Sequence, residues 1–475
     1  MKNLLYIISL CGLLTACDLQ EEPYGFYSDD NFYKSETDAE SGLLYAYNAL
    51  TFLEYSRGIF YIGDIPTETM SPKSDEAGDV YQLENWINRA NTVIDHIQNS
   101  SVLSETARRR ILGEAYFLRA WNYFNLVRTF GIVPVQTKMV AELSQTTPPM
   151  ATGLDQLYDL ILGDLTRADN LLEVNKVFGR ADKVAAQSLM AKAYLTIASS
   201  FRNNLDRYTE MRREPRIMYD SAAYWAGKVV RDYKNVYDFD TNLRDIYDVD
   251  KPTGPEHIFI MPIDRSGTQE GNYSKLPLLF LPSNNSVPFY IRYGNGDLQR
   301  ANGNGWGVFL CNDEFVETQF STTDKRRTEL IHRDIYDASG NPIVPNQVKG
   351  YFSSKYVDPD FIGERTSARP YLIRFSDIAL VYAEAAGPEA GLAYVNRIRE
   401  RAGVTPLPSG MTTDKFREAV IKERALELAF EGNRLYDLRR TASVTTTDIK
   451  AAGLSEAEAA YYPIPQREID LNPNL

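Results

Sequence analysis

The sequence predicts a mostly α-helical protein in which packed helix pairs form a scaffold that carries one irregular lobe. Two observations favour this fold class. Long stretches before residue 236 and after residue 369 place apolar side chains at helical spacing and begin or end at capping residues. Between them, residues 236–369 are rich in Gly, Pro, Asn and Asp and hold only short β-like runs. The length of 475 residues is ample for a large core.

The chain opens with MKNLLYIISLCGLLTACDLQEE, which has the order of an export signal. A positive start is followed by an apolar run that is too short to span a bilayer, and small residues then precede Cys17. The stretch LTAC resembles the lipobox of bacterial lipoproteins. We therefore expect residues 1–16 to be a signal peptide and Cys17 to be lipidated. An ordinary secretory signal with an incidental cysteine is the alternative.

Residues 17–35 lack periodicity and are expected to form an extended tether between the lipid and the scaffold. The acidic residues directly after Cys17 resemble the tag that sends lipoproteins of Bacteroidetes to the outer cell surface. The expected location is thus the outer membrane, with the lipid as anchor and the protein facing the cell exterior. No later run of 18 apolar residues occurs in the sequence.

The net charge of −13 excludes nucleic acid as a partner, because phosphates need a basic face. It also argues against electrostatic attachment to anionic lipid. Of the three cysteines, Cys11 leaves with the signal and Cys17 carries the lipid, so no internal disulfide is expected. Cys311 lies among apolar residues and is expected to be an inert core thiol.

The first part of the scaffold is expected in residues 36–235, as helices at 37–53, 81–97, 104–131, 154–172, 182–201 and 219–232. The longest has Ser104 as its N-cap and ends at Gly131. Alanines recur where neighbouring helices would meet. Helix pairs with small residues at packing positions are typical of tetratricopeptide repeats, although no complete repeat signature occurs. Degenerate, tetratricopeptide-like pairs are therefore expected.

Residues 236–369 are predicted to form a loop-rich ligand lobe, because a segment of this kind in a compact domain is either functional or disordered. Its aromatic content argues against disorder. Within it, ANGNGWG at residues 301–307 predicts a flexible loop, and HIFIMPI predicts a short strand. Residues 370–475 are expected to complete the scaffold with helices at 375–386, 391–404 and 412–441, the last broken at Gly432, so that the whole forms one compact domain.

Charged residues in the helical stretches have structural roles in this prediction. Glu423, Glu427 and Glu431 recur every four positions near several arginines, which on an exposed helix gives ion pairs worth about 0.3 kcal/mol each. Arg119 and Arg128 lie in apolar surroundings and are expected to clamp carbonyls or carboxylates between helices.

Three stretches together resemble one family, the SusD/RagB surface lipoproteins. They are GEAYFLRAWNYFNLVRTFGIVPV, YLIRFSDIALVYAEAA with AYVNRIRERAGV, and IKERALELAFEGNRLYDLRRT with the tail YYPIPQREIDLNPNL. The resemblance runs from the lipobox to the last residue and is weakest in the lobe.

The resemblance implies a monomeric, SusD-like helical scaffold without catalytic activity. It also implies a lid over a SusC-like TonB-dependent transporter of the outer membrane, to which the protein delivers a captured glycan. RagB-like relatives are associated with peptides, so capture of a peptide or another nutrient is the alternative. An exposed aromatic platform would favour a glycan, and a narrow groove with free backbone groups would favour a peptide.

An enzyme is not expected. The three histidines are widely separated, and the sequence lacks the His-Glu-x-x-His, Gly-x-Ser-x-Gly and phosphate-binding loop motifs. No cofactor is expected either. The stretch DRSGTQEGN, which begins at Asp264, alternates oxygen-bearing side chains without the ordered calcium pattern, so calcium stays an open alternative.

The ligand site is predicted in residues 273–309, which hold seven aromatic residues where the average composition predicts roughly four. A sugar ring stacks on an exposed aromatic plane and bonds to polar groups at its rim. Phe280 and Phe309 lie in apolar runs and are assigned to the core. The remaining candidates for ligand contact are Tyr273, Tyr290, Arg292, Tyr293, Asn304 and Trp306.

A second candidate is the stretch 60–81, from which contacts are expected at Asp64, Thr67, Glu68 and Tyr81. In glycan-binding members of the resembled family this loop often ends in tryptophan, which is absent here. Trp86 falls inside the following helix, where burial is expected. A ligand that is smaller or more polar than a long starch helix therefore fits better.

Overall fold

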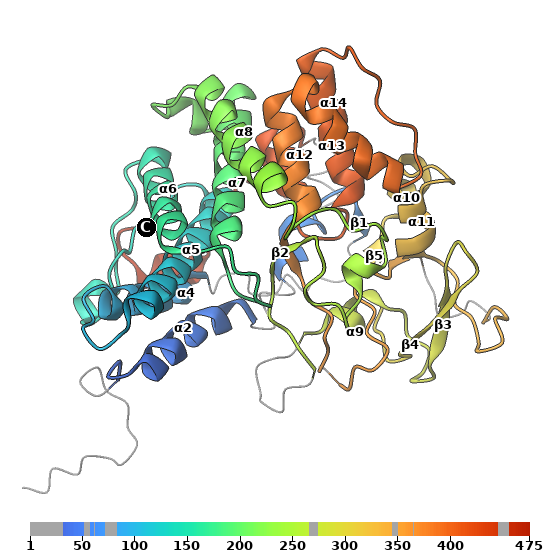
Figure 1. Cartoon of the computed structure of the whole chain (residues 1–475), viewed down its shortest axis with the longest axis horizontal. Helices are drawn as coiled ribbons and strands as arrows, with labels where there is room; N and C mark the ends of the chain where they lie inside the picture. The colour runs from blue at the N-terminus through green and yellow to red at the C-terminus, as the bar shows by residue number, and fades with distance from the viewer. Residues whose placement is uncertain are drawn as a thin grey trace, which may run out of the picture.

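The computed structural model describes residues 32–51, 58–60, 62–71, 83–265, 274–343, 350–363, 365–444 and 456–475. It is mostly helical, as predicted, and its strands are short (Figure 1). The signal, Cys17, the side chain of Trp86, the candidate contacts Tyr81 and Tyr273, and most of the stretch weighed for calcium lie outside the described residues.

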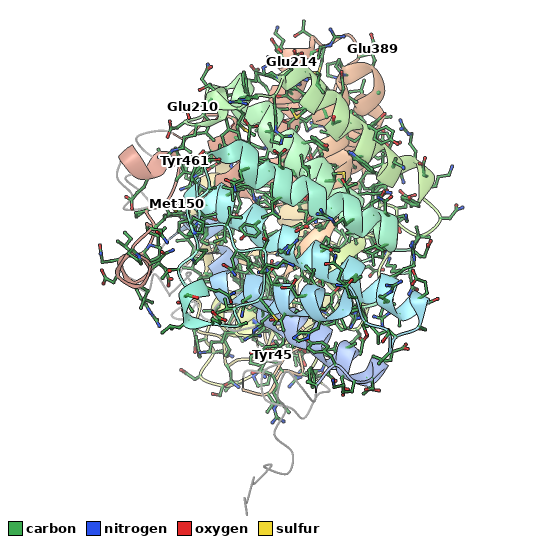
Figure 2. All side chains as sticks on the ribbon, turned by 90° about the vertical axis from the view of Figure 1, so that its left-hand side faces the viewer. Tyr45, Met150, Glu210, Glu214, Glu389 and Tyr461 are labelled. Carbon is green, nitrogen blue, oxygen red and sulfur yellow. The ribbon has the colours of Figure 1, made fainter. Side chains whose placement is uncertain are left out.

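The first part of the scaffold is a row of helices in which each packs against the next along the chain. Figure 2 shows them side by side, from α2 at the lower edge to α8 at the top. They are α2 (Glu36–Thr51), α4 (Leu83–Ile97), α5 (Glu105–Phe130), α6 (Leu154–Leu171), α7 (Lys183–Arg202) and α8 (Pro215–Asp232). The predicted bounds hold within a few residues. Helix α8 begins four residues early because Pro215 suits a first helical turn.

Helix α5 shows why the sequence located these elements well. The Ser104 hydroxyl accepts a hydrogen bond from the Ala107 backbone N–H, and Gly131, at φ +76°, ends the helix as predicted. The predicted role of Arg119 as a clamp between helices is confirmed. It reaches from α5 to Asp164 of α6 at 2.7 Å and donates to Asn91 of α4 at 3.0 Å. The helix contacts α2, α4, α6 and α7, and this central position buries nearly all of its faces.

The C-terminal helices continue the row, because α12 (Phe375–Ala386) packs against α8 and α7. The others are α13 (Pro388–Arg401), α14 (Thr413–Glu427), α15 (Arg434–Arg440) and α17 (Gln466–Leu471). The predicted break in 412–441 is confirmed at Gly432, whose φ is +77°, but it is wider than expected. Helix α14 already ends at Glu427, and Phe430 also has a positive φ, +64°.

The regularly spaced glutamates do not form a surface ladder, which corrects the prediction. Glu423, Glu427 and Glu431 are buried, since α14 is covered by α12, α13 and the lobe. Their partners lie mostly outside α14. Arg374 bridges three carboxylates, at 2.8 Å from Glu256, 2.9 Å from Glu427 and 2.8 Å from Glu431. The C-terminal motif is therefore the charged centre of the molecule.

The lobe is held together by four antiparallel strand pairs and three short helices. The pairs are β1 (Met70–Ser71) with β5 (Leu310–Cys311), β2 (His257–Ile260) with β8 (Tyr371–Arg374), β3 (Phe289–Arg292) with β4 (Leu298–Ala301), and β6 (Ile331–His332) with β7 (Phe352–Ser353). The helices are α9 (Leu276–Phe280), α10 (Asp313–Gln319) and α11 (Lys325–Leu330).

Two of these strand pairs cross the predicted boundaries of the lobe, because β1 and β8 come from outside residues 236–369. The division into 17–35, 36–235, 236–369 and 370–475 stays a prediction. One large hydrophobic cluster fills the scaffold, and two smaller clusters lie in the lobe. Cys311 belongs to a lobe cluster, where burial raises the pKa of its thiol well above the usual range, in line with the predicted core position.

Candidate functional site

The two regions predicted to bind a ligand meet at one edge of the lobe. Strand β1, from the stretch 60–81, pairs with β5, which follows the aromatic stretch 273–309 (Figure 1). Ser71 lies opposite Leu310, so β1 ends on the side of β5 that leads back to Trp306. The backbone N–H of Asn312 also donates to Thr69 at 3.0 Å. The structure thus joins two stretches that the sequence offered separately.

Trp306 is the most exposed of the described candidate aromatics, with 50% of its surface accessible. The backbone around Trp306 is held by α9 and by Leu281, the residue after α9. The Trp306 N–H donates to the Leu278 carbonyl at 2.6 Å, and the Gly307 N–H donates to the Leu281 carbonyl at 2.8 Å. The Lys275 ammonium lies 5.7 Å from the centre of the indole ring. Asn304, two residues earlier, is also exposed. The result is an aromatic plane at the surface on a fixed backbone.

The stretch around Trp306 is a loop, as predicted, and its glycines serve close packing. A Cβ atom on Gly303 would lie 2.0 Å from the carbonyl oxygen of Val287, and one on Gly305 would lie 2.1 Å from that of Leu281. Only glycine lets these two backbones touch. Two backbone hydrogen bonds join this loop to the turn at 284–286. The N–H groups of Asn284 and Ser286 both donate to the Gly303 carbonyl, at 3.0 and 3.2 Å.

The hairpin β3–β4 presents a second set of candidates. Tyr290 lies opposite Arg300 on its outer face and is half-buried, and its backbone exchanges two hydrogen bonds with Tyr336, at 2.8 and 2.9 Å. The Arg292 guanidinium stacks 4.2 Å above the Tyr336 ring and donates to the Gly340 carbonyl. Tyr290 and Arg292 therefore reach the surface, as predicted, on a braced element. Their contact with a ligand stays a prediction.

Tyr293 is not the exposed ring that the sequence predicted, because only 5% of its surface is accessible. It continues the inward positions of Phe289 and Ile291, since side chains alternate along a strand. The Arg244 guanidinium covers its ring at 4.5 Å, and its hydroxyl donates to Gln299. Burial raises the pKa of Tyr293 to about 12.

Asp64 and Thr67 are likewise buried, which corrects the expectation that they are open to a ligand. The Asp64 carboxylate accepts backbone hydrogen bonds from Gly432 at 2.6 Å and Arg434 at 3.3 Å. Glu68, which is partly exposed, pairs with Arg434 at 2.6 Å. These polar side chains attach the segment 62–71 to the break between α14 and α15. Burial raises the pKa of Asp64 to about 7, although the two N–H donors oppose the shift.

Sequence reasoning missed a cavity of about 600 Å³, here called the lobe cavity. Four separate segments line it, with Arg244, Asp248, Tyr293, Asp297, Arg300, Glu329 and Ser354 among its residues. Of its lining, the sequence analysis had named Tyr293 as a candidate contact, and the run of carboxylates in DIYDVD, residues 245–250, was a further signal. A second cavity, of about 700 Å³, lies between α2, α5 and the loop after α6, and its charged groups pair with one another, as in Arg180–Glu114 at 2.7 Å.

Among the residues that the structure describes, no group of three or more His, Cys, Asp or Glu side chains could hold a metal ion. His332 is buried, and this burial lowers its pKa to about 3. In the same part of the chain, none of the helices combines the length and the apolar character needed to cross a bilayer.

Two family models match the chain. One is described as "SusD family" and matches residues 330–475, and the other is described as "Starch-binding associating with outer membrane" and matches residues 61–195. A relative from Formosa agariphila, SusD-like protein P2, is 25% identical over 490 aligned residues, which cover 92% of this chain and 89% of the relative.

Solved structures show the same fold. A SusD homolog from Bacteroides thetaiotaomicron superimposes with a TM-score of 0.74 at 20% identity, covering 94% of this chain and 98% of the homolog. A structure described as "Laminarin binding SusD-like protein" gives a TM-score of 0.73 at 22% identity, with coverage of 93% and 98%.

Proposed function

Because the chain belongs to the SusD family, we propose that it is a non-catalytic receptor on the bacterial cell surface that captures a glycan. It delivers this oligo- or polysaccharide to a SusC-like TonB-dependent transporter in the outer membrane. The family model that matches residues 61–195 is described by starch binding and association with the outer membrane. Both properties agree with this proposal.

Trp306 carries the proposal. A sugar ring has an apolar face, and an exposed indole offers a matching plane that a peptide backbone does not need. Because the loop around Trp306 is braced by backbone contacts at Gly303 and Gly305, little conformational entropy is lost when a ligand stacks on the ring. Asn304, two residues before Trp306, is exposed and supplies a polar group beside this surface.

Membrane attachment follows from the lipobox, and the acidic residues behind Cys17 favour display to the exterior. In this proposal the lipid holds the receptor and the segment up to residue 35 spans the distance to the scaffold. The transporter then lies within reach of the tether, and the receptor acts as its lid.

The test uses the mature protein without its lipid, with Cys17 replaced, in affinity electrophoresis through gels that contain laminarin, starch or other polysaccharides. Retardation by one polysaccharide is expected, and Trp306→Ala should weaken binding about tenfold, or ~1.4 kcal/mol. Tyr45→Ala is the matched control, because Tyr45 is an exposed aromatic on α2, at the lower edge of Figure 2. Binding of peptides with no retardation by any polysaccharide would replace the glycan with the peptide alternative.

A further inference from the structure

The lobe cavity is separate from the Trp306 surface. Its walls are the turn at 242–250, the stretch 293–300 that includes β4, the end of α11 and residues 354–359. No residue of the Trp306 loop or of α9 lines it. Its volume of about 600 Å³ lies within the usual range of small-ligand sites, roughly 300–1,000 Å³. It can therefore hold a molecule that the Trp306 surface does not bind.

The charge of this cavity is negative. Two guanidinium groups, from Arg244 and Arg300, face five carboxylates in the lining: those of Asp245, Asp248, Asp250, Asp297 and Glu329. Two cations outside the lining pair with three of these carboxylates, Lys251 with Asp245 and Asp248 and Arg265 with Asp250, so a small negative excess is left. A cleft lined by an excess of one sign concentrates ligands of the opposite sign. Anionic ligands should be repelled and cationic ligands attracted.

Neither guanidinium group is available as an anion clamp. Arg244 lies over the Tyr293 ring and pairs with Asp297 at 3.2 Å. Arg300 donates to the Pro359 carbonyl at 2.9 Å and lies 3.4 Å from Asp360. The same stacking covers the face of Tyr293, so a ligand in this cavity is held by hydrogen bonds and charge and not by an aromatic plane.

Glu329 is the carboxylate best placed to receive a cation. Its side chain keeps only 17% exposure, and its ion pair with Arg244 is long, at 3.5 Å. Gly294 packs closely against this carboxylate, because a Cβ atom there would lie 2.9 Å from the Glu329 carboxylate oxygen. A mostly buried carboxylate is stabilised by each further charged donor that reaches it. An ammonium group in the cavity would supply such a donor.

We propose that the lobe cavity is a second binding site, which takes a hydroxylated ligand with an ammonium group, such as a hexosamine, and that Glu329 binds the ammonium. Asn242, Gln299 and Ser354 line the same cavity and offer partners for hydroxyl groups. This site does not depend on glycan capture at Trp306.

The test compares three sugars that share one ring but differ in charge: glucosamine, N-acetylglucosamine and glucuronate. Calorimetry on the mature protein should give the affinity order glucosamine, then N-acetylglucosamine, then glucuronate, with at least a tenfold span that shrinks in 1 M salt. Glu329→Gln should remove the preference for glucosamine. Asp250→Asn should reduce this preference less than Glu329→Gln does. Because 74% of the Asp250 side chain is exposed, the substitution should also leave the fold intact.

Trp306→Ala serves as the control and should bind glucosamine as the wild type does. Equal affinities for the three sugars, or no binding of any, would overturn the proposal while leaving glycan capture at Trp306 untouched. Loss of glucosamine binding in Trp306→Ala would place the ligand at the other surface. If Nα-acetyl-lysine amide, which keeps its side-chain ammonium group, binds as tightly as glucosamine, the cavity selects an ammonium group without a sugar. That result would overturn the hexosamine assignment.

Discussion

Arg374 has only 1% of its side chain exposed, at a point where carboxylates converge from α14, from its C-terminal break and from the lobe. Its charge lowers the pKa of Glu431, opposing the effect of burial. Removing one partner of a buried ion pair leaves an uncompensated charge, which is far more costly than losing an exposed pair. The most recognisable charged residues of the C-terminal motif thus hold scaffold and lobe together.

Arg374→Met should therefore lower the free energy of unfolding by about 3–5 kcal/mol in chemical denaturation. Lys138→Ala is the control. Lys138 also makes an ion pair, with Asp95 at 2.9 Å, but 72% of its side chain is exposed, so a loss of less than about 1 kcal/mol is expected. Similar losses in both variants would contradict a buried network.

Asp64 predicts a pH dependence of stability. Its pKa is about 7 in the folded protein and near 3.8 when unfolded, mainly because burial disfavours the charged form. The folded state therefore binds the proton of Asp64 more tightly than the unfolded state does. Asp64 makes its full contribution to the free energy of unfolding below pH 4, and this contribution is lost as the pH rises through 7. Glu431 raises this pKa further, and Lys355 opposes it.

Asp64→Asn should remove this slope, which amounts to up to about 4 kcal/mol between pH 4 and pH 7. The measurement is the free energy of unfolding of both proteins across that range. Their difference isolates Asp64 from other groups, such as His332, whose lowered pKa gives a slope of the opposite sign. Parallel curves for the two proteins would refute the assignment.

At the scale of elements, the Trp306 loop predicts a sharp response to small substitutions. Gly303→Ala and Gly305→Ala would press a methyl group against a carbonyl oxygen and should each cost about 1–3 kcal/mol, with weaker glycan binding. Gly153→Ala is the matched control, because Gly153 has open space around it and an extended φ of 165°. Thermal unfolding and affinity electrophoresis measure both effects, and unchanged binding in all three variants would show that the loop need not be rigid.

Helix positions could be predicted because their signals are local. Ser104 and Gly131 mark the two ends of α5 by hydrogen bonds within one or two turns. Tyr293 was predicted to be exposed although it continues the inward alternation of Phe289 and Ile291, and the Arg244 guanidinium that covers its ring comes from a distant turn. Glu423 and Glu427 lie on α14 as their spacing predicted, but Glu431 lies beyond its end, and all three are buried because α12, α13 and the lobe cover them.

At the scale of the molecule, the sequence offered two separate candidate stretches and no sign that they meet. No local pattern indicates that β1 pairs with β5. The lobe cavity was missed for the same reason, because its four wall segments meet only in the folded chain. The SusD-like architecture, by contrast, was predicted from long motifs at 113–135 and 371–404, and the solved structures confirm it.

The proposed anchor gives a prediction at this scale. Cys17→Ser should move the protein from the membrane fraction to the soluble fraction and abolish partitioning into detergent, since several acyl chains are lost at once. Fractionation of cells with an antibody against the scaffold measures this. Cys311→Ser is the control, because Cys311 is buried in the lobe and should not affect partitioning. An unchanged membrane fraction for Cys17→Ser would exclude the lipid anchor.

The bond between Asp64 and the Gly432 backbone joins residues 368 positions apart. The helices of the scaffold contact their neighbours in sequence and can pack before the C-terminal part of the chain has folded. The segment 62–71, which ends in β1, cannot form its bonds to the backbone of Gly432 and Arg434 until those residues are in place. We infer that the edge where β1 pairs with β5 is completed last in folding, so a chain truncated before residue 432 would lack the bonds that fix the segment 62–71.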